Sequence, residues 1–328
     1  MRTLVYTGPG RVEMEEQQRS AAAENEVEIA VEFAGICGSD VSGFLGHSPR
    51  RKAPLVLGHE FVGRLSDGTR VVANPLMSCG HCACCLSGQQ NLCATWKLLG
   101  MDRTQGAFAE YVAVPRSQVC AIPDKLPSMR AVLTEPLANI VHLFRIAAPP
   151  PMFRMAIIGA GTMGALALQC ALKIGAREVL LADVNDERLV VMTAMGSSHS
   201  VNVATAEGAA KAKEISGWGY DLTIDASGGE AARQLAFDLC RPGGQVALLG
   251  MASASSKLDF VTSIRKEHRV QMTFAYTPVD FQQALTMLID GVIDLSPYTV
   301  TYPLESGQTA FDVVTTNPKS SLKFLLRI

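Results

Sequence analysis

The sequence has no long apolar run, no basic stretch and no block of like charges. Its 328 residues include 29 Lys and Arg against 31 Asp and Glu, which leaves a formal net charge of −2. A helix that spans a bilayer needs about 20 mostly apolar residues, and no segment meets that need. Binding to nucleic acid or to an anionic membrane surface requires clustered positive charge. We therefore expect neither nucleic acid nor a membrane as a partner.

The N-terminus also lacks the apolar core of a secretory signal, because Met1–Tyr6 already follows a strand pattern. We accordingly expect a cytoplasmic protein. In a reducing compartment, clustered cysteines indicate metal binding more than disulfides. Five of the nine cysteines fall between Cys79 and Cys93, and Cys37 precedes a His-Glu pair. The remaining three lie in apolar surroundings and are expected to be buried thiols: Cys120, Cys170 and Cys240.

The first part of the chain reads as β structure. A length of 328 residues is too great for one small core and suggests about two domains. Alternating or β-branched residues, separated by Gly and Pro turns, predict strands at Thr3–Tyr6, Glu26–Phe33, Arg70–Ala73 and Phe108–Val114. These strands predict a compact, mostly antiparallel domain that carries loops.

From Met155 the pattern changes to strands that alternate with helices. Helices are expected at Ala165–Lys173 and Glu230–Cys240, and Pro242–Gly244 reads as a turn. Six strands in such an alternation predict an α/β domain with a doubly wound parallel sheet. The expected strands are Met155–Ile158, Glu178–Asp183, His199–Val203, Tyr220–Asp225, Gln245–Gly250 and Arg269–Phe274.

After Tyr276 the pattern changes again. A helix at Val279–Asp290, a strand at Tyr298–Tyr302, a helix from Glu305 and the apolar end Leu322–Ile328 are expected. These elements do not extend the parallel sheet, so we expect them to return to the β domain. The expected organisation is therefore a catalytic β domain in residues 1–137, a cofactor domain in residues 138–276, and a return to the catalytic domain in residues 277–328.

A glycine motif of the form G-x-G-x-x-G lies between the first strand and helix of the α/β part. Gly159 permits a tight turn, Gly161 lets a pyrophosphate approach the backbone, and Gly164 allows close packing of helix on strand. Asp183 ends the next strand, where a carboxylate accepts hydrogen bonds from the adenosine ribose and repels a 2′-phosphate. We predict an NAD site, with a glycine turn in another kind of α/β sheet as the alternative. The predicted cofactor-binding residues are Gly159, Gly161, Thr162, Met163, Gly164 and Asp183.

Four cysteines follow the spacing C-x2-C-x2-C-x7-C, at Cys79, Cys82, Cys85 and Cys93. Four thiolates on one short loop can close a tetrahedral shell, which is the form of a structural zinc site with no open position. Cys84 is left outside this pattern. The alternatives are a cluster of free thiols, or His81 as a ligand in place of one cysteine.

A second candidate metal site combines Cys37 with the pair His59-Glu60. Thiolate, imidazole and carboxylate suit a zinc ion with an open position. Beside a nicotinamide, such an ion binds the oxygen of an alcohol and lowers its pKa, and Ser39 can carry the hydroxyl proton outward. The alternative is a buried thiol at Cys37 and an ordinary loop histidine at His59. The four-cysteine loop and the dinucleotide motif together favour zinc catalysis.

These motifs, with Gly106–Tyr111 and Glu135–Leu137, resemble the zinc-dependent medium-chain alcohol dehydrogenases along essentially the whole chain. Within that family the chain looks most like the sorbitol, polyol and threonine dehydrogenase branch. That branch supplies carboxylate ligands where liver-type enzymes use a second cysteine. The resemblance implies a GroES-like, mostly antiparallel β catalytic domain and a Rossmann domain. It also implies two zinc ions per chain, one catalytic and one structural, with NAD as the cofactor and assembly as a homotetramer or homodimer.

The resemblance further implies roles for individual residues. Cys37, His59 and Glu60 become ligands of the catalytic zinc, and Ser39 becomes the proton-relay hydroxyl. Glu135 becomes a fourth ligand or a partner through water, exchanging with Glu60 or with substrate. The implied reaction is the reversible oxidation of a secondary alcohol, of polyol or sugar type, to a ketone with hydride transfer to NAD+. The alternatives are a dehydrogenase of a simple alcohol or amino alcohol, and a non-catalytic NAD-binding protein that keeps only the structural zinc.

Two features depart from most relatives. The turn before the strand at Arg70 is shorter, which should affect only the surface. Behind Asp40, where several relatives have a relay histidine, this chain has Ser42–Gly43. His47 is a possible substitute, and the proton path beyond Ser39 therefore stays open.

Side chains near these motifs are candidates for the substrate pocket. The apolar members of this group are more often packing than recognition residues. Arg51 belongs to the run Arg50–Lys52, which as a charge run predicts a solvated face, although an arginine there can read a phosphate or carboxylate on a substrate. The candidate positions are Phe44, Arg51, Trp96, Leu99, Met101 and Phe274.

Overall fold

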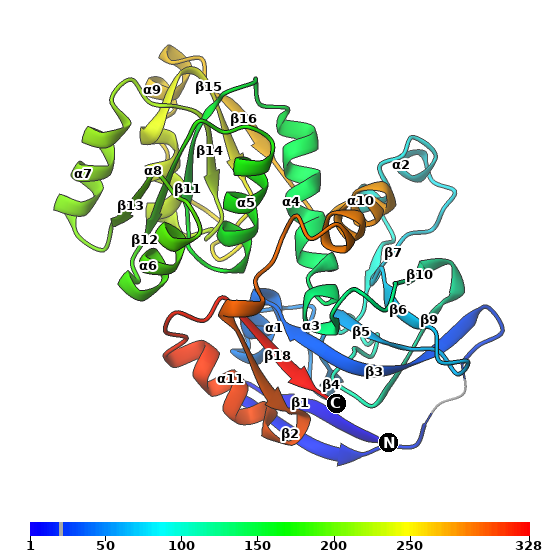
Figure 1. Ribbon diagram of the computed structural model, residues 1–328. Helices are drawn as coiled ribbons and strands as arrows, with labels where there is room; N and C mark the ends of the chain where they lie inside the picture. Colours follow the sequence, from blue (N-terminus) through cyan, green and yellow to red (C-terminus); the bar gives the residue numbers. More distant parts are fainter. Residues whose placement is uncertain (20–21) are drawn as a thin grey trace. The chain divides into compact units, whose positions relative to one another are not determined.

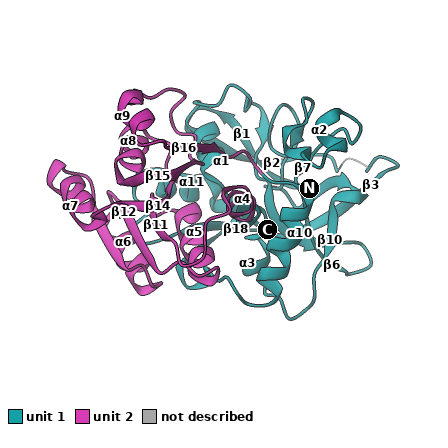
Figure 2. Ribbon diagram, turned by 90° about the horizontal axis from the view of Figure 1, so that it is seen from above, with its two compact units in different colours: residues 1–138, 276–328 teal, residues 139–275 magenta. Residues whose placement is uncertain are grey.

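The chain forms two compact units (Figure 2). The computed structural model describes residues 1–19 and 22–328. Unit 1 contains Met1–Ala138 and Tyr276–Ile328, and unit 2 contains Asn139–Ala275. Helix α4, Thr134–Ala147, therefore contributes residues to both units. In the described ranges, no helix is long and apolar enough to cross a membrane.

Unit 1 is organised around a seven-stranded sheet. Its strands are β3 (Glu26–Ile36), β5 (Glu60–Arg64), β6 (Arg70–Ala73), β9 (Tyr111–Pro115), β10 (Val119–Ala121), β17 (Thr299–Pro303) and β18 (Lys323–Arg327). They follow the order β10-β6-β5-β3-β18-β17, and β9 also pairs with β3. Among the pairs that these described strands form, only β17–β18 is parallel. The C-terminal strand lies directly beside β3, with Leu325 opposite Gly35, so the end of the chain completes a sheet that the N-terminal segment begins (Figure 1).

A smaller sheet and one helix enclose the core of unit 1. The sheet contains β2 (Arg11–Glu16), β1 (Arg2–Gly8) and β4 (Leu55–Val56) in that order. Phe311 of α11 (Gly307–Thr316) stacks on Phe44, with ring centroids 4.7 Å apart, and its own ring is fully buried.

The other elements of unit 1 are β7 (Leu76–Met77), β8 (Lys97–Leu98), α1 (Gly38–Phe44), α2 (Ala83–Leu86), α3 (Ser128–Ala131), α10 (Pro278–Ile289) and four 3-10 turns at Gln90–Leu92, Arg116–Gln118, Ser296–Tyr298 and Leu304–Ser306.

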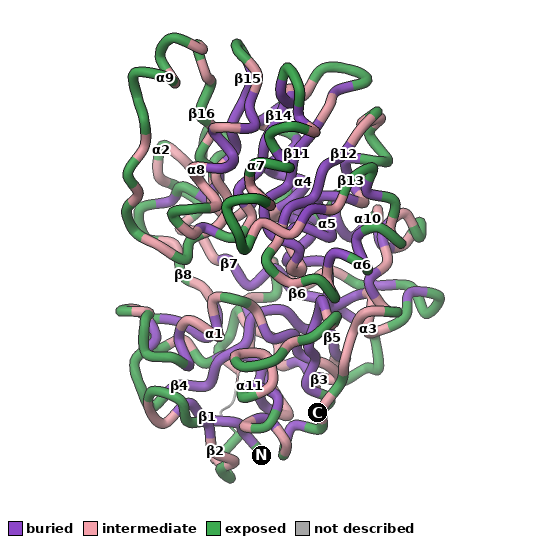
Figure 3. The backbone as a smooth tube through the Cα atoms, turned by 90° about the vertical axis from the view of Figure 1, so that its left-hand side faces the viewer, coloured by how far each residue is buried: buried purple, intermediate pink, exposed green. Residues whose placement is uncertain are grey.

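Unit 2 is a six-stranded parallel sheet with helical crossovers. The strands are β11 (Arg154–Ile158), β12 (Glu178–Asp183), β13 (His199–Asn202), β14 (Tyr220–Asp225), β15 (Cys240–Leu248) and β16 (Arg269–Met272), and the helices are α5 (Thr162–Lys173), α6 (Asp186–Ala194), α7 (Ala206–Ser216), α8 (Glu230–Leu239) and α9 (Phe260–Arg265). The order β13-β12-β11-β14-β15-β16 is that of a doubly wound sheet. Its central strands β11, β12 and β14 are mostly buried (Figure 3). The predicted fold class is thus confirmed.

One local prediction in unit 2 is wrong. Pro242–Gly244 does not form a turn that separates a helix from a strand, because the strand runs through it. Tyr220 pairs with Cys240, whereas Leu222 pairs with Gln245. The pairing thus advances by two residues along β14 but by five residues along β15. The extra residues of β15 bulge out of the sheet. The glycines that suggested a turn allow this bulge inside the strand.

Candidate active site and metal centres

Cys37 lies at a junction between strand and helix. It follows Ile36, the last residue of β3, and is the N-cap of α1. Its backbone N–H donates to Oδ2 of Asp40 at 3.1 Å, within a reciprocal capping box. Because this cap holds the first turn of a short helix, the thiol of Cys37 has a defined position at the end of the strand.

His59 and Glu60 come from the neighbouring strand. His59 immediately precedes β5, and Glu60 is its first residue, paired opposite Gly35 of β3. This pairing brings Cys37, His59 and Glu60 together, with one ligand atom of each within 4.8 Å of the others. Zinc binds such atoms at about 2.0–2.3 Å, so the ligands of one ion lie within about 4.6 Å of each other. The donor set and its spacing fit a zinc ion.

Asp40 lies on the Nδ1 side of the His59 imidazole. Nδ1 of His59 lies 3.5 Å from Oδ1 of Asp40, which leaves Nε2 as the nitrogen for a metal. Burial opposes ionisation of Asp40, but His59 and then Arg51 outweigh it and lower the pKa of Asp40 to about 2. Burial also lowers the pKa of His59, and Asp40 and Cys37 together outweigh that effect and raise it. Asp40 therefore remains a carboxylate that orients the ring.

A lysine that the sequence analysis did not single out lies beside Glu60. Lys323 is the first residue of β18, and 1% of its side chain is exposed. Its Nζ forms an ion pair with Oε2 of Glu60 and donates to the carbonyl of Ile36 at 3.1 Å. A Cβ on Gly35 would overlap this Oε2 and lie 2.8 Å from Cε of Lys323. Glycine at position 35 thus leaves room for the buried ion pair.

Glu135, in the first turn of α4, lies near this group. Burial raises the pKa of Glu135 to about 7, and Glu60 adds to the rise. His59, Tyr276 and Lys323 oppose it, so all four groups are within electrostatic reach of this carboxyl. Among the residues that the structure describes, however, the set within 4.8 Å contains Glu60 and not Glu135. The two glutamates therefore interact electrostatically, and Glu60 is the one that belongs to the set with the thiol and the imidazole.

The hydroxyl of Ser39 is held by an arginine. Nη2 of Arg51 donates to Oγ of Ser39 at 2.9 Å and lies 3.5 Å from Oδ1 of Asp40. Only 2% of the Arg51 side chain is exposed. The prediction of a solvated charge run is therefore wrong for Arg51, although Arg50 is half-buried and Lys52 is exposed. The guanidinium of Arg51 is instead buried against Ser39 and Asp40.

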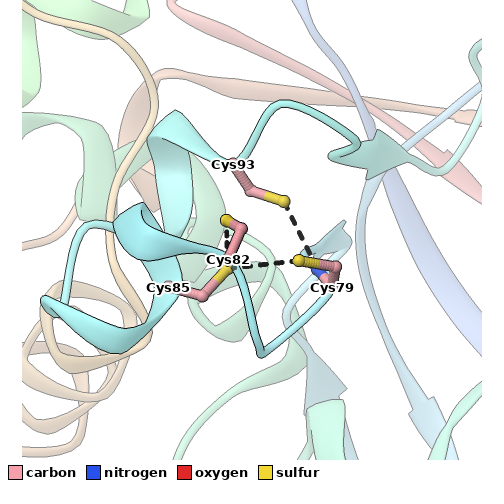
Figure 4. Close-up of side chains that lie close together, drawn as sticks. All are labelled: Cys79, Cys82, Cys85 and Cys93. Atoms are coloured by element: carbon pink, nitrogen blue, oxygen red, sulfur yellow. Dashed lines mark hydrogen bonds between the residues drawn. The ribbon is translucent and has the colours of Figure 1, made fainter.

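The four cysteines converge on the loop between β7 and β8, and their side chains point toward one another (Figure 4). Sγ of Cys85 lies 3.5 Å from Sγ of Cys82 and 3.9 Å from Sγ of Cys79. The backbone N–H of Cys79 donates to Sγ of Cys93 at 3.4 Å. All four sulfur atoms lie within 4.8 Å of one another. This arrangement fits a closed, tetrahedral zinc site.

The environment of these cysteines favours a thiolate on part of the set. The backbone N–H of Cys79 and the hydroxyl of Thr95 lower the pKa of Cys93 to about 6, whereas burial raises that of Cys85 to about 11. The thiolate is the form that ligates zinc. His81 is exposed, and its Nδ1 lies 2.8 Å from the carbonyl oxygen of Cys79, so the ring is directed to the backbone.

The glycine motif joins β11 to α5. Gly159 has a φ of 115°, a conformation that L side chains rarely adopt. A Cβ on Gly164 would overlap the carbonyl oxygen of Gly159. Gly161 is the N-cap of α5, which begins with Thr162 and Met163. The first backbone N–H groups of α5 and the positive end of its dipole suit the pyrophosphate of a dinucleotide.

Asp183 ends β12 beside this turn. Its Oδ2 accepts from the backbone N–H of Ala160 at 2.5 Å, and its Oδ1 accepts from that of Asn185 at 2.8 Å. Arg188 of α6, which the sequence analysis missed, also reaches the turn, with Nη1 4.0 Å from a Cβ built on Gly161. Burial lowers the pKa of Arg188, and Asp183 opposes that shift. An arginine five residues after the acid at the strand end was the signal available in the sequence.

Two of the candidate pocket positions, Phe44 and Leu99, serve packing. Phe44 and Leu99 are each 2% exposed and belong to the core of unit 1. The guanidinium carbon of Arg50 lies over the ring of Trp96, 3.7 Å from the ring centroid. Arg50 also forms an ion pair with Asp102. These positions do not define a substrate class.

Comparison with known proteins supports the same family. Residues 23–124 match the alcohol dehydrogenase GroES-like domain, and residues 162–290 match the zinc-binding dehydrogenase domain. The chain is 32% identical over 318 residues to an L-threonine 3-dehydrogenase of Stenotrophomonas maltophilia, with 92% of each chain covered.

The chain is also similar to two solved structures from Escherichia coli. Galactitol-1-phosphate dehydrogenase has a TM-score of 0.91 and 28% identity, with all of both chains covered. An alcohol dehydrogenase from strain CFT073 complexed with NADH has a TM-score of 0.92 and 27% identity, covering 100% of this chain and 99% of that one. The chain belongs to the zinc-dependent medium-chain alcohol dehydrogenase family, in its polyol and threonine dehydrogenase-like branch.

Proposed function

We propose that this protein oxidises a secondary alcohol of polyol or sugar type to a ketone, reversibly, with hydride transfer to NAD+. One observation carries the proposal: Cys37, His59 and Glu60 converge in unit 1, and Cys37 lies two residues before Ser39 in the chain. The reaction balances when the carbinol carbon gives a hydride to the nicotinamide and the hydroxyl gives up its proton, which leaves ketone, NADH and H+.

Each residue of the group has a proposed role. Cys37, His59 and Glu60 hold the catalytic zinc, with Glu135 as a fourth ligand or a partner through water. When bound, zinc acts as a Lewis acid on the alcohol oxygen and lowers its pKa. Ser39 takes up the hydroxyl proton at Oγ. The ion pair with Lys323 lowers the net negative charge around Glu60. This supports an exchange between Glu60 and Glu135 in the role of zinc ligand.

The cofactor and the second zinc complete the proposal. Asp183 favours NAD over NADP, because its carboxylate at the strand end repels a 2′-phosphate. Faster turnover with NADP+ than with NAD+ would contradict this assignment. The four convergent thiols of Cys79, Cys82, Cys85 and Cys93 would hold the structural zinc.

An amino alcohol is the second candidate substrate. The similarity to an L-threonine 3-dehydrogenase, at 32% identity over 92% of the chain, favours it. A hydroxyl beside an amine presents the same secondary carbinol to zinc and cofactor, so the site chemistry described above serves either substrate.

Metal analysis and a substrate screen test the proposal together. The screen offers polyols, sugar phosphates and amino alcohols with NAD+ and follows the absorbance of reduced nicotinamide. We expect two zinc ions per chain in the wild type and one in Cys37→Ala, with turnover lost in that variant. One zinc ion in the wild type and no turnover of any alcohol would instead identify a non-catalytic NAD-binding protein.

A further inference from the structure

Arg51 is buried beside the proposed proton-transfer residue, although the reaction itself requires no cation there. A buried guanidinium is costly unless its charge and its donors are paired. Its Nη2 bonds Ser39 at 2.9 Å, and its distance to Asp40 is 3.5 Å. In the part of the chain that the structure describes, Nε of Arg51 has no hydrogen-bond partner. An unpaired donor on a buried charge costs stability, so the position of Arg51 calls for another explanation.

Helix α1 is shaped to accept this side chain. Gly43 lies four residues after Ser39, on the same helix face. A Cβ on Gly43 would overlap Cδ of Arg51 and lie 3.1 Å from its Cβ. Alanine favours a helix over glycine by about 1 kcal/mol, so helix propensity does not explain this glycine. Gly43 instead provides the space that the stem of Arg51 occupies.

We infer that Arg51 is a positioning residue for the proposed reaction, holding Oγ of Ser39 ready to exchange a proton with the alcohol. A serine hydroxyl has one proton and two lone pairs, and the bond from Arg51 occupies one lone pair. The guanidinium has no lone pair to offer and stays protonated, so it cannot receive the proton. Arg51 restricts rotation of the hydroxyl, and the proton leaves Ser39 by another route. The inference rests on the proposed function.

The same guanidinium links two parts of the site. Asp40 lies between Arg51 and His59, with its Oδ1 3.5 Å from a nitrogen of each. Arg51 thus holds both the hydroxyl of Ser39 and the carboxylate that orients His59. Its contribution should therefore appear in the rate of the chemical step more than in substrate affinity.

The test compares Arg51→Met with Arg50→Met, which removes the same charge one residue away. Losing one charge-assisted hydrogen bond should lower kcat about 10- to 100-fold, with KM changed by less than about threefold. Arg51→Lys keeps the charge and should recover part of kcat. Arg50→Met should stay within about twofold of wild type, because Arg50 bonds Asp102 and stacks on Trp96. Arg51→Met and Arg50→Met should each retain two zinc ions per chain.

A double-mutant cycle separates positioning from a merely structural role. In a Ser39→Ala background, Arg51→Met should lower the residual kcat by a clearly smaller factor than in the wild-type background, because only its contact with Asp40 remains. Gly43→Ala, which displaces Arg51 without changing it, should lower kcat as Arg51→Met does. An equal loss of kcat with and without Ser39 overturns the inference, and so does a wild-type kcat in Arg51→Met. In either case, alcohol turnover by the wild type leaves the proposed function intact. A wild type that oxidises no alcohol overturns both.

Discussion

Replacing Lys323 by Met measures how strongly the buried ion pair supports unit 1. Met preserves most of the side-chain volume but removes the charge that pairs with Glu60 and the donor to the carbonyl of Ile36. Both ionic side chains are 1% exposed. Removing one partner of a buried pair costs about 3–5 kcal/mol, because the other charge stays buried without compensation. Metal-free Lys323→Met should therefore lose stability by that amount.

The loss should be visible in thermal unfolding. For a unit of about 150–250 residues, 1 kcal/mol shifts the midpoint by about 2–4 °C, so the metal-free variant should melt about 6–20 °C lower than metal-free wild type. A zinc ion on Glu60 would supply a replacement positive charge, so the shift should be smaller in zinc-loaded protein. Scanning calorimetry with and without chelator measures both shifts. Lys125→Met, at an exposed lysine of the same unit, is the control and should change stability by less than about 0.5 kcal/mol.

A second variant checks the physical reason. Glu60→Gln combined with Lys323→Met removes both charges, so neither remains buried alone, and most of the lost stability should return. A metal-free Lys323→Met protein that melts within about 2 °C of wild type would refute the argument. So would a double variant that is no more stable than Lys323→Met.

Three further changes test the metal and cofactor sites. Gly35→Ala places a methyl group that overlaps the Glu60 carboxylate, so metal analysis should find one zinc ion fewer per chain. Gly8→Ala is the control, because a Cβ there meets nothing within 4 Å, and it should retain both ions. Cys93→Ser should also leave one zinc ion and lower the melting midpoint, because a structural zinc stabilises its loop; two retained ions would contradict the four-thiol assignment. Asp183→Ser removes the carboxylate that repels a 2′-phosphate and should shift the ratio of kcat/KM for NAD+ and NADP+ toward NADP+ by about tenfold; an unchanged ratio would show that Asp183 does not select the cofactor.

Sequence reasoning worked where the chemistry lies within a short segment. The cysteine loop spans Cys79 to Cys93, and the glycine turn spans Gly159 to Gly164. In each segment the spacing itself limits the geometry, so residue types and intervals predict which atoms come together. The structure accordingly places all four sulfur atoms together, and it places Gly159 in the positive-φ conformation that a tight turn requires.

Sequence reasoning failed where a contact depends on packing between distant segments. Arg51 appeared to be part of a charged surface run, because nothing in the spacing shows that Gly43 leaves space for it. Lys323 did leave a signal, a cation followed by three apolar residues of the same strand. Its partner, Glu60, is 263 residues away and is identified only by strand pairing. Similarly, Pro242–Gly244 suggested a turn because composition cannot distinguish a turn from a bulge inside a paired strand.

Strand β3 explains why the site draws on such distant parts of the chain. Its C-terminal end leads into Cys37, β5 on one side brings Glu60, and β18 on the other side brings Lys323. Because alternate residues of a strand face opposite sides of a sheet, a shift of one residue between β18 and β3 would turn Lys323 away from Glu60. The observed register, with Leu325 opposite Gly35, is thus what places the cation. The last residues of the chain therefore determine the charge balance at a glutamate near its beginning.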